Sequence, residues 1–331
     1  MGNRGMALQG LWLLAFLAAI GGGPGQAREF NSSDVYPANA PTVQALTYMG
    51  TLIERETKGR LKIRPPETSD GDSENYIVAQ VRTGRLDMAR INAAVLNAMV
   101  PSTAVISAPY LFKSDVALHN VLDGPIGEGI LADLEQHGLV GLAFYDVGPR
   151  SLFSSEKPVR SPADLKGLRV RSQPGDLARN LWQAFGAEPI SMPYGRVSDA
   201  LRTNVVDAAT DNWVSFVAGG HYRFAKYFTP TEHARTPGIL IFSLEVWRQL
   251  SESDRKIIRA AARESAIRER QLMQAYTAQA RRTVQERGVA IIEDADIAAF
   301  RSAMIALHPG LFTDPKQQEL FQRIQASGPN N

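Results

Sequence analysis

The sequence predicts an α/β protein built as two lobes, with one long helix lying against both of them. The chain has 331 residues, about twice the size of an ordinary domain of roughly 150 residues. Segments with helical spacing alternate with short apolar segments that are typical of strands. A long stretch in the last third of the chain contains neither glycine nor proline, so one helix there would be longer than a lobe is wide.

The first residues have the features of an exported protein. Arg4 is the only charged residue within residues 1–27, and an apolar run follows over residues 11–20. Gly25 and Ala27 place small residues where a signal peptidase cuts, which predicts a signal peptide over residues 1–27. An uncleaved membrane anchor is the alternative, although the run is short for a bilayer core of about 30 Å. We therefore expect a periplasmic protein, because an exported chain without cysteine suits that compartment.

Three elements are predicted early in the mature chain. Apolar residues recur at helical spacing over residues 42–57, and Gly59 ends this helix. Residues 61–64 form a short strand candidate. Residues 75–82 again have helical spacing, and Gly84 ends that second helix. This order of helix, strand and helix is typical of an α/β layer.

Three apolar segments further along the chain are predicted to be strands. Residues 139–147 form a nearly continuous apolar run, and residues 168–171 and 238–243 form shorter ones. Ser161 begins a Ser-Pro-Ala-Asp sequence, which is typical of a helix start. Because helices and strands alternate, we expect parallel sheets with crossover helices.

The long helix is predicted over residues 252–287. Ser251 can cap its start, and Gly288 ends it. Such a helix would be about 54 Å long, whereas a small domain is roughly 30 Å across. Two shorter helices with an unrecognised break are the alternative, although breaks normally coincide with glycine or proline.

Composition and missing motifs exclude several classes of function. The chain has no cysteine, which excludes disulfides, thiolate zinc sites, cysteine-ligated iron–sulfur clusters and cysteine nucleophiles. A formal net charge of +2 gives no electrostatic basis for nucleic-acid binding. No HExxH, GxSxG, P-loop or GxGxxG motif occurs after a suitable element. We therefore expect no catalytic residue, no cofactor and no metal site, although an acid–base pair far apart in sequence would leave no motif.

Two arginines stand where ligands bind in an α/β sheet. Arg150 follows the strand at residues 139–147, and Arg171 ends the strand at residues 168–171. Ligands lie beyond the carboxyl ends of strands in such sheets, so two guanidiniums there can hold a carboxylate, one of them bidentately. Alternatively, each arginine pairs with a local aspartate or extends into solvent.

A set of short motifs occurs in a fixed order along residues 28–305. They are Ser33–Pro37, Gly71–Glu74, Gly84–Asn92, Gly148–Ser151, Lys157–Val159, Ser161–Arg171, Gly186–Tyr194, Ala200–Asp207, Asn212–Trp213, His233 and the run from Ser243 to Leu250. With these motifs the chain resembles the solute-binding subunit of TRAP transporters, the DctP-type family. It resembles most the branch that binds sugar acids, the uronate-type proteins, through Met88-Ala89-Arg90, Arg150-Ser151 and Asn212-Trp213.

The resemblance implies a two-lobed periplasmic binding protein fold with a hinge and a long helix spanning both lobes. Lobe I would comprise residues 28–147 plus about 236–270, and lobe II residues 148–235 plus about 271–331. The cleft between them would capture a small organic acid, a sugar acid such as a uronate, and the closed form would deliver it to the permease subunits in the membrane. We expect the protein to be a monomer.

The resemblance further implies a set of ligand-binding residues. Arg171 would hold the ligand carboxylate, with Arg150 beside it, and Tyr194 is the aromatic residue of a Met-Pro-aromatic motif. The other implied ligand-binding positions are Tyr36, Glu74, Arg90, Asn92, Asp211, Asn212 and Trp213. Judged from the residues alone, Tyr194 and Trp213 can either stack on a sugar ring or fill the core.

A few positions depart from the family pattern. Residues 207–211 are Asp-Ala-Ala-Thr-Asp where the family usually has Asp-Gly-x-Glu-Asn, so Thr210 and Asp211 replace a glutamate and an asparagine. A carboxylate at Asp211 repels a ligand carboxylate unless an arginine neutralises it or it carries a proton. Arg196 stands where the family usually has glutamate, and Tyr36 where the uronate branch often has histidine.

Two other functions are compatible with the same sequence. A periplasmic sensor would present its ligand to a receptor instead of a permease, and the chain alone does not separate the two. A secreted lyase or isomerase acting on sugar acids would need an acid–base pair, for which Glu74, Tyr194 and Asp211 are the available groups.

Overall fold

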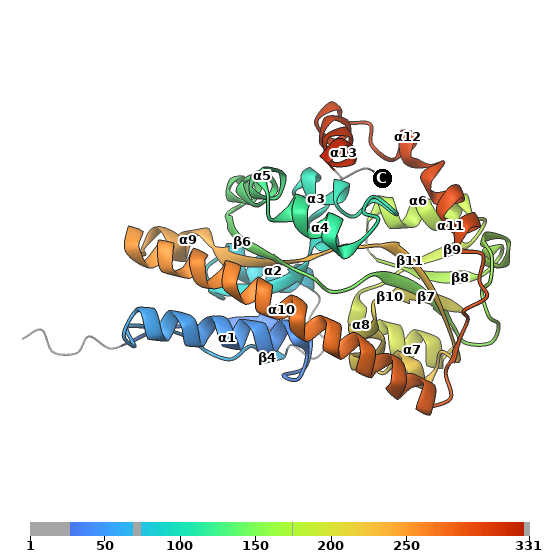
Figure 1. Ribbon diagram of the computed structural model, residues 1–331, viewed down its shortest axis with the longest axis horizontal. Coiled ribbons are helices and arrows are strands. Elements are labelled where there is room, and N and C mark those ends of the chain that lie inside the picture. The colour runs from blue at the N-terminus through green and yellow to red at the C-terminus, as the bar shows by residue number, and fades with distance from the viewer. Residues whose placement is uncertain (1–26, 69–73, 174, 328–331) are drawn as a thin grey trace, which may run out of the picture.

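The computed structural model describes residues 27–68, 74–173 and 175–327. The predicted signal peptide, apart from its last residue, lies outside the described residues, as does most of the motif at residues 71–74. The described chain forms two lobes, each built on one large sheet with helices packed on it, and the long helix α10 (Glu252–Glu286) runs along both (Figure 1). No described helix is long and apolar enough to cross a membrane.

The first lobe contains a five-stranded sheet and a separate parallel pair of strands. The sheet has the order β4 (Glu67–Thr68), β2 (Ser32–Asp34), β5 (Met88–Asn92), β12 (Gly238–Ser243) and β6 (Leu139–Tyr145). The separate pair is β1 (Arg28–Phe30) with β3 (Leu61–Ile63). Strand β2 is parallel to β4 and β5, whereas β12 is antiparallel to β5 and β6.

The second lobe contains a six-stranded sheet. Its order is β13 (Ala290–Ile291), β11 (Tyr227–Ala234), β7 (Arg150–Ser154), β10 (Ala208–Asp211), β8 (Arg169–Ser172) and β9 (Glu188–Ser191). Strand β8 is parallel to β9 and β10, whereas β7 is antiparallel to β10 and β11. The amino end of β7 therefore lies at the same edge as the carboxyl ends of β8 and β10.

The α/β class and the two lobes are confirmed, but parallel pairing holds for only part of each sheet. The chain leaves the first sheet after β6 and enters the second as β7 without a crossover helix. It returns in the same way from β11 to β12. Because no helix reverses the chain at these two crossings, β7 and β12 run antiparallel to the strands beside them.

Helices cover the first sheet. Helix α1 (Pro41–Glu56) begins with proline at its first position and buries Leu46, Met49 and Ile53, as the apolar spacing predicts. The predicted helix at residues 75–82 is also present, as α2 (Glu74–Arg82). The other helical elements here are η1 (Ala93–Leu96), α3 (Pro101–Val105), α4 (Asp115–Leu122), α5 (Pro125–Asp133), η2 (Leu134–His137) and α9 (Leu244–Arg248).

Shorter helices surround the second sheet. The helix start predicted at Ser161 is a single 3-10 turn, η3, which the Ser161 side chain and Asp164 cap reciprocally. The helical elements are η3 (Pro162–Leu165), α6 (Asp176–Ala184), η4 (Tyr194–Arg196), α7 (Val197–Arg202), α8 (Trp213–Ala218), η5 (His221–Arg223), α11 (Ile297–Ile305) and α12 (His308–Leu311).

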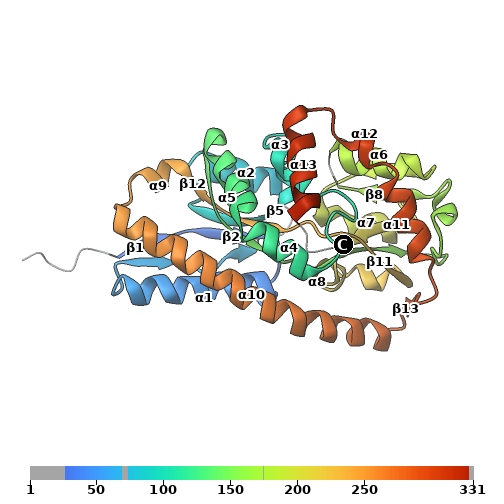
Figure 2. The same ribbon diagram turned by 45° about the horizontal axis from the view of Figure 1, so that its top comes forward.

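Helix α10 is one unbroken helix, as the sequence predicts. The Ser251 side chain accepts a hydrogen bond from the Asp254 backbone N–H at its start, and 35 residues follow, which makes it about 52 Å long. Ile258 packs in the core of the first lobe beside α1, and Val284 packs in the core of the second lobe. Figure 2 shows the helix beside α1 and continuing past it under the second lobe.

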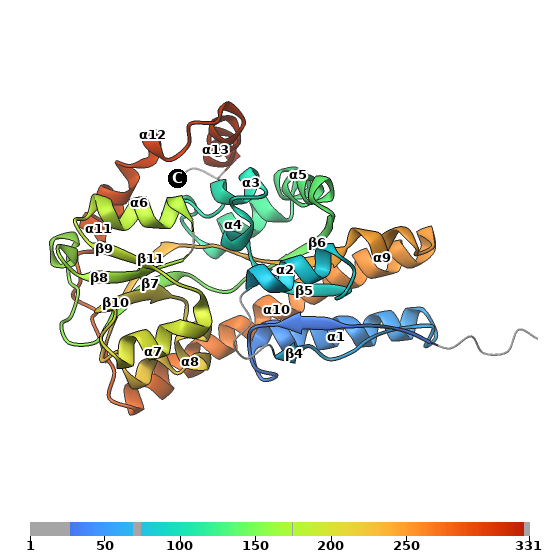
Figure 3. The same cartoon turned by 180° about the vertical axis from the view of Figure 1, so that it is seen from behind.

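The C-terminal segment returns to the first lobe. Phe312 and, in helix α13 (Pro315–Ser327), Phe321 and Ile324 belong to the same buried cluster as Val105 of α3. Figure 3 shows α13 above α3, away from the second sheet. This differs from the expected division, which placed residues 271–331 with lobe II, because the apolar face of α13 is buried against the first lobe.

A buried glutamate of α10 binds the backbone where the chain crosses between the sheets after β6. Oε2 of Glu269 accepts a hydrogen bond from the Asp146 N–H at 2.9 Å. Its Oε1 is buried and has no hydrogen-bond partner. Burial raises the pKa of Glu269 well above its usual range, and the nearby Asp146 carboxylate adds to this. The folded protein therefore holds a proton on this carboxyl group under conditions in which the unfolded chain has released it.

The replacement Glu269→Gln is expected to flatten the dependence of stability on pH. In the wild type the unfolded chain loses its proton from about pH 4.3 upward, so stability falls as the pH rises towards the raised pKa, by up to about 1.4 kcal/mol per pH unit. Glutamine mimics the protonated carboxyl group and removes this slope. Urea unfolding between pH 5 and pH 8 measures it, with Glu286→Gln on the exposed face of the same helix as the control. Parallel slopes in wild type and Glu269→Gln would contradict the prediction.

Candidate functional site

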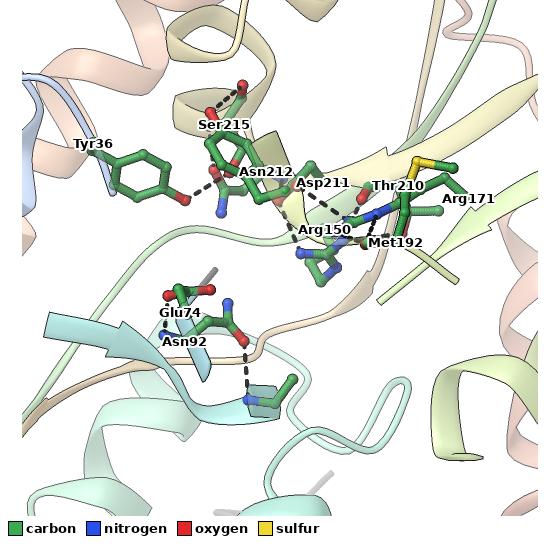
Figure 4. Close-up of polar contacts among 12 residues, drawn as sticks. Tyr36, Glu74, Asn92, Arg150, Arg171, Met192, Thr210, Asp211, Asn212 and Ser215 are labelled. Carbon is green, nitrogen blue, oxygen red and sulfur yellow. Dashed lines mark hydrogen bonds and ion pairs between the residues drawn. The ribbon is translucent and has the colours of Figure 1, made fainter. Parts of the chain in front are cut away.

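A cavity of about 530 Å³ lies between the two lobes. Strands and loops of both sheets line it, and the charged groups gather at the sheet edges that face each other. Of the ten residues proposed from the sequence, eight line this cavity: Tyr36, Glu74, Arg90, Asn92, Arg150, Arg171, Tyr194 and Asp211. Figure 4 shows Glu74 and Asn92 on one side and the arginines with Asp211 on the other.

The sheet register explains why Arg150 and Arg171 meet. Arg150 is the first residue of β7, whereas the sequence analysis took it as the residue after a strand. Since β7 is antiparallel to β10, with Ser151 opposite Asp211, the start of β7 lies at the end of β10. Arg171 in β8 lies at the same edge, because β8 and β10 are parallel.

Arg150 is buried and its two terminal nitrogens are both occupied. Nη1 donates to Oδ1 of Asp211 at 2.9 Å. Nη2 donates to the backbone carbonyl and, at 3.2 Å, to the side-chain oxygen of Thr210. Arg150 thus pairs with an aspartate, as in the alternative left open from the sequence, although Asp211 is near it in space and not along the chain.

Arg171 is equally buried but less completely paired. Nε and Nη2 donate to the Met192 carbonyl at 3.2 and 3.0 Å. Nη1 lies 3.8 Å from Oδ2 of Asp211, which is too far for a hydrogen bond. Burial lowers the pKa of Arg171 to about 10, and Asp211 only partly opposes this. The guanidinium is still a cation at neutral pH, and it keeps donor capacity on Nη1.

Asp211 is a buried carboxylate between the two arginines. Its Oδ1 accepts hydrogen bonds from Arg150 and from the Asn212 N–H at 3.0 Å. Burial alone would raise the pKa of Asp211, but Arg150 and Arg171 outweigh burial and hold the pKa below its usual range. The neutralisation that the sequence analysis required of this departure from the family pattern is therefore present.

The first lobe contributes an acid and an amide to the opposite wall. Oε1 of Glu74 accepts a hydrogen bond from the Asn92 N–H at 2.7 Å and lies 3.7 Å from Nη1 of Arg90. Burial raises the pKa of Glu74, which Arg90 partly opposes. Oδ1 of Asn92 accepts a hydrogen bond from the Ala94 N–H at 3.0 Å. This bond fixes the amide, so its NH₂ group is oriented before a ligand arrives.

Arg90 is held by an acid that lies behind the cavity wall. Its Nε donates to Oδ2 of Asp34 at 3.0 Å, and its Nη2 donates to Oδ1 of the same carboxylate. The guanidinium lies 4.5 Å from the centre of the Tyr36 ring, a distance typical of a cation–π contact. Arg90 therefore positions Tyr36, and Asp34 and Glu74 are the acids that compensate its charge.

Tyrosines close one end of the cavity. The Tyr36 hydroxyl lies 2.6 Å from the Ser215 hydroxyl, which links the two lobes directly (Figure 4). The Tyr194 hydroxyl donates to the Ser215 carbonyl at 3.2 Å, and the two tyrosine rings meet edge to face. Burial raises the pKa of Tyr36 to about 12, so its hydroxyl stays protonated.

Two proposed residues lie outside the cavity lining. Asn212 caps α8: its side chain accepts a hydrogen bond from the Ser215 N–H at 2.8 Å. Trp213 stacks on Phe228, with ring centres 3.9 Å apart, in the core of the second lobe. The structure thus places Trp213 in the core, which is one of the two possibilities left open from the sequence.

The sequence analysis also missed other polar residues of the cavity lining, among them Ser198, Ser215 and His221. The Ser198 hydroxyl lies 2.8 Å from Nδ1 of His221, and burial lowers the pKa of His221 to about 4. Ser215 could have been found, because it lies one helical turn after the capping Asn212. Within residues 27–68, 74–173 and 175–327, no cluster of three or more histidine, aspartate or glutamate side chains could hold a metal ion.

Fold and cavity together define the class of solute-binding proteins, in which a ligand cavity lies between two lobes. The chain belongs to the DctP family, the bacterial extracellular solute-binding proteins of family 7, whose sequence model matches residues 32–314. Proteins of this family bind solutes and are not enzymes.

Known relatives cover almost the whole chain. A solute-binding protein of Chromohalobacter salexigens is 31% identical over 301 residues, which are 91% of this chain and 90% of the relative. The TRAP periplasmic solute-binding protein of a Bradyrhizobium species, solved with D-galacturonate, is 40% identical, with a TM-score of 0.88 over 91% of this chain and 100% of that one. The corresponding Xanthobacter autotrophicus protein, solved with β-D-galacturonate, is 38% identical, with a TM-score of 0.85 over 90% and 99% of the two chains.

Proposed function

We propose that this chain is the periplasmic subunit of a TRAP transporter and captures a uronate, a sugar acid with one carboxylate, between its lobes. The Arg171 guanidinium carries the proposal, because it is a buried cation on the cavity with donor capacity left on Nη1. A ligand carboxylate placed there receives charge-assisted hydrogen bonds. The cavity volume of about 530 Å³ suits one sugar ring.

The rest of the lining supplies partners for ring hydroxyls. The Asn92 amide can donate, and the carboxyl groups of Glu74 and Asp211 can accept. Tyr36 and Tyr194 offer aromatic surface beside these polar groups. The proteins of known structure described above, solved with galacturonate, support the choice of ligand class. We further propose that the protein acts as a monomer and delivers the ligand to the permease subunits in the membrane.

Calorimetric titration with D-galacturonate and D-glucuronate tests the proposed ligand. We expect saturable binding of at least one of them with a Kd in the micromolar range or below, and a matching rise in Tm. Glucose and galactose serve as controls, since they have the ring but lack the carboxylate. If neither acid binds while a neutral sugar does, or if a bound acid is recovered chemically changed, the proposal is wrong.

A further inference from the structure

A second cavity, of about 580 Å³, lies beside the first one and is also lined by both lobes. The residues that line both cavities are Ala94, Asn97, Ala98, Arg150, Gln173 and Gly175. The first lobe contributes two alanines to this shared wall, and the second lobe contributes the Arg150 guanidinium. The two cavities are therefore neighbouring parts of one cleft, and several of the side chains where they meet are small.

The end of the second sheet lies between the two cavities. Asp211 and Thr210 are successive residues of β10, so their side chains point to opposite faces of the sheet. Asp211 lines the first cavity, on the face covered by α7 and α8, and Thr210 lines the second cavity, on the face covered by α6 (Figure 1). Arg150 lies at this end of the sheet and donates from Nη1 to Asp211 and from Nη2 to Thr210. A ligand that extends past Arg150 would therefore occupy both cavities.

The lining of the second cavity suits an uncharged sugar ring. In the described part of this lining the charged side chains are Arg150, which is bound to Asp211, and Asp176, which pairs with Arg179. His233 is buried, and burial lowers its pKa to about 3, so the imidazole is uncharged at neutral pH. The other polar side chains are amides and hydroxyls, among them Asn97, Ser107, Asn180, Thr236 and Gln317. Such groups exchange hydrogen bonds with sugar hydroxyls.

Two amides of the first lobe are oriented before a ligand arrives. Oδ1 of Asn97 accepts a hydrogen bond from the Thr103 hydroxyl at 3.0 Å, so the NH₂ group of this amide is the part that can donate to a ligand. Nε2 of Gln317 donates to the Pro101 carbonyl at 2.8 Å, so Oε1 is the part that can accept. The second cavity thus offers one fixed donor and one fixed acceptor to a sugar ring.

We propose that the cleft takes a disaccharide in which a uronate is linked to a neutral sugar, with the uronate in the first cavity and the neutral ring in the second. This inference rests on the proposed function and deepens it, because it names the substrate class. Arg171 lines the first cavity and not the second, so it holds the carboxylate on the far side of Arg150 from the neutral ring. The uronate ring bears its carboxylate on C5 and the link to the neutral sugar on C1, so its two ends can serve the two cavities.

The test compares affinities within two pairs of ligands that share the same acid ring. The pairs are D-galacturonate with 2-O-α-D-galacturonosyl-L-rhamnose, and D-glucuronate with 2-O-α-D-glucuronosyl-D-xylose. In at least one pair we expect the wild type to bind the disaccharide about tenfold or more tightly than the monosaccharide, because the second ring adds hydrogen bonds. If a monosaccharide binds and neither disaccharide binds more tightly, the inference is wrong while the proposed function stands. If none of the four ligands binds, the proposed function is wrong.

The replacement Ala178→Phe tests the second cavity itself. Ala178 lies on α6 and lines the second cavity but not the first, so a phenylalanine there takes the place of the neutral ring. The ratio of disaccharide to monosaccharide affinity should fall to about one. The matched control is Ala184→Phe, which adds the same group at an exposed position of the same helix and should leave the ratio unchanged. A ratio in Ala178→Phe equal to that of the wild type would contradict the inference.

A measurement on the wild type covers the case in which Ala178→Phe does not fold. Hydrogen exchange of the α6 backbone is followed with each ligand of a pair at saturation. The disaccharide should slow exchange in α6 at least about twofold more than the monosaccharide does, because only the disaccharide reaches this helix. Helix α1, which lies outside the second cavity, should exchange equally with both. Equal exchange of α6 with both ligands would overturn the inference.

Discussion

Replacing Arg171 with alanine is expected to abolish tight binding of a uronate. Removing one partner of a buried charge-assisted pair costs about 2–5 kcal/mol, which corresponds to roughly 30-fold or more in Kd. Arg171→Lys should recover only part of this loss, because a lysine ammonium cannot serve the Met192 carbonyl and the ligand with the geometry of a planar fork. Calorimetric titration with D-galacturonate measures the Kd of the wild type, Arg171→Ala and Arg171→Lys.

The matched control for this prediction is Arg169→Ala. Arg169 lies in the same strand, two residues earlier, but it pairs with Asp207 and does not line the cavity. Its loss should leave the affinity within about twofold of the wild type, since a partly exposed ion pair contributes little. If Arg171→Ala and Arg169→Ala bound a uronate equally well, Arg171 would not be the carboxylate anchor.

Removing the carboxylate of Asp34 is expected to destabilise the protein more than any other single change to the site. Asp34 is completely buried and accepts hydrogen bonds from Thr42 Oγ1 at 2.8 Å, from the Tyr36 N–H at 3.0 Å and from Arg90. In Asp34→Ala the buried Arg90 guanidinium would lose both of its hydrogen bonds to a carboxylate and keep only Glu74, 3.7 Å from Nη1, as an acidic neighbour. Breaking such a pair costs about 3–5 kcal/mol, and urea unfolding measures the loss.

A double variant distinguishes the lost pair from a general packing defect. Asp34→Leu combined with Arg90→Met replaces both charges with apolar groups, and it should be more stable than Asp34→Ala alone. Asp294→Ala removes an aspartate from an exposed ion pair with Arg160 and should cost less than about 1 kcal/mol. Equal losses in Asp34→Ala and Asp294→Ala would mean that burial of the pair contributes nothing.

Some single elements were predictable from the sequence because their signals are local, whereas strands such as β7, β10 and β11 were not predicted. The helix at residues 41–56 shows its apolar face, and α10 follows from a capping serine and the absence of breakers. Pairing between strands is not a local property. Nothing near Arg150 indicates that it begins a strand antiparallel to β10, because that depends on a partner about 60 residues later.

The site shows the same division between local and long-range information. The two arginines and Asp211 were placed by motifs, but the pairing that ties Arg150 to Asp211 needs the sheet register. Trp213 was proposed as a ligand-binding residue from the resemblance, because the residues alone do not distinguish a tryptophan that stacks on a ligand from one in the core. The aromatic partner that buries it, Phe228, lies on a strand that the sequence analysis did not predict.

The position of β12 has a consequence for the order in which the lobes can form during synthesis. This strand lies between β5 and β6 in the first sheet, yet it is made after all of β7–β11. An emerging polypeptide that stops at residue 237 therefore has a nearly complete second sheet and a first sheet with a gap through its middle. The sheet of the first lobe therefore cannot be completed until the strands β7–β11 of the second lobe have been synthesised. A shortened gene product ending at residue 237 would expose the unpaired edges of β5 and β6.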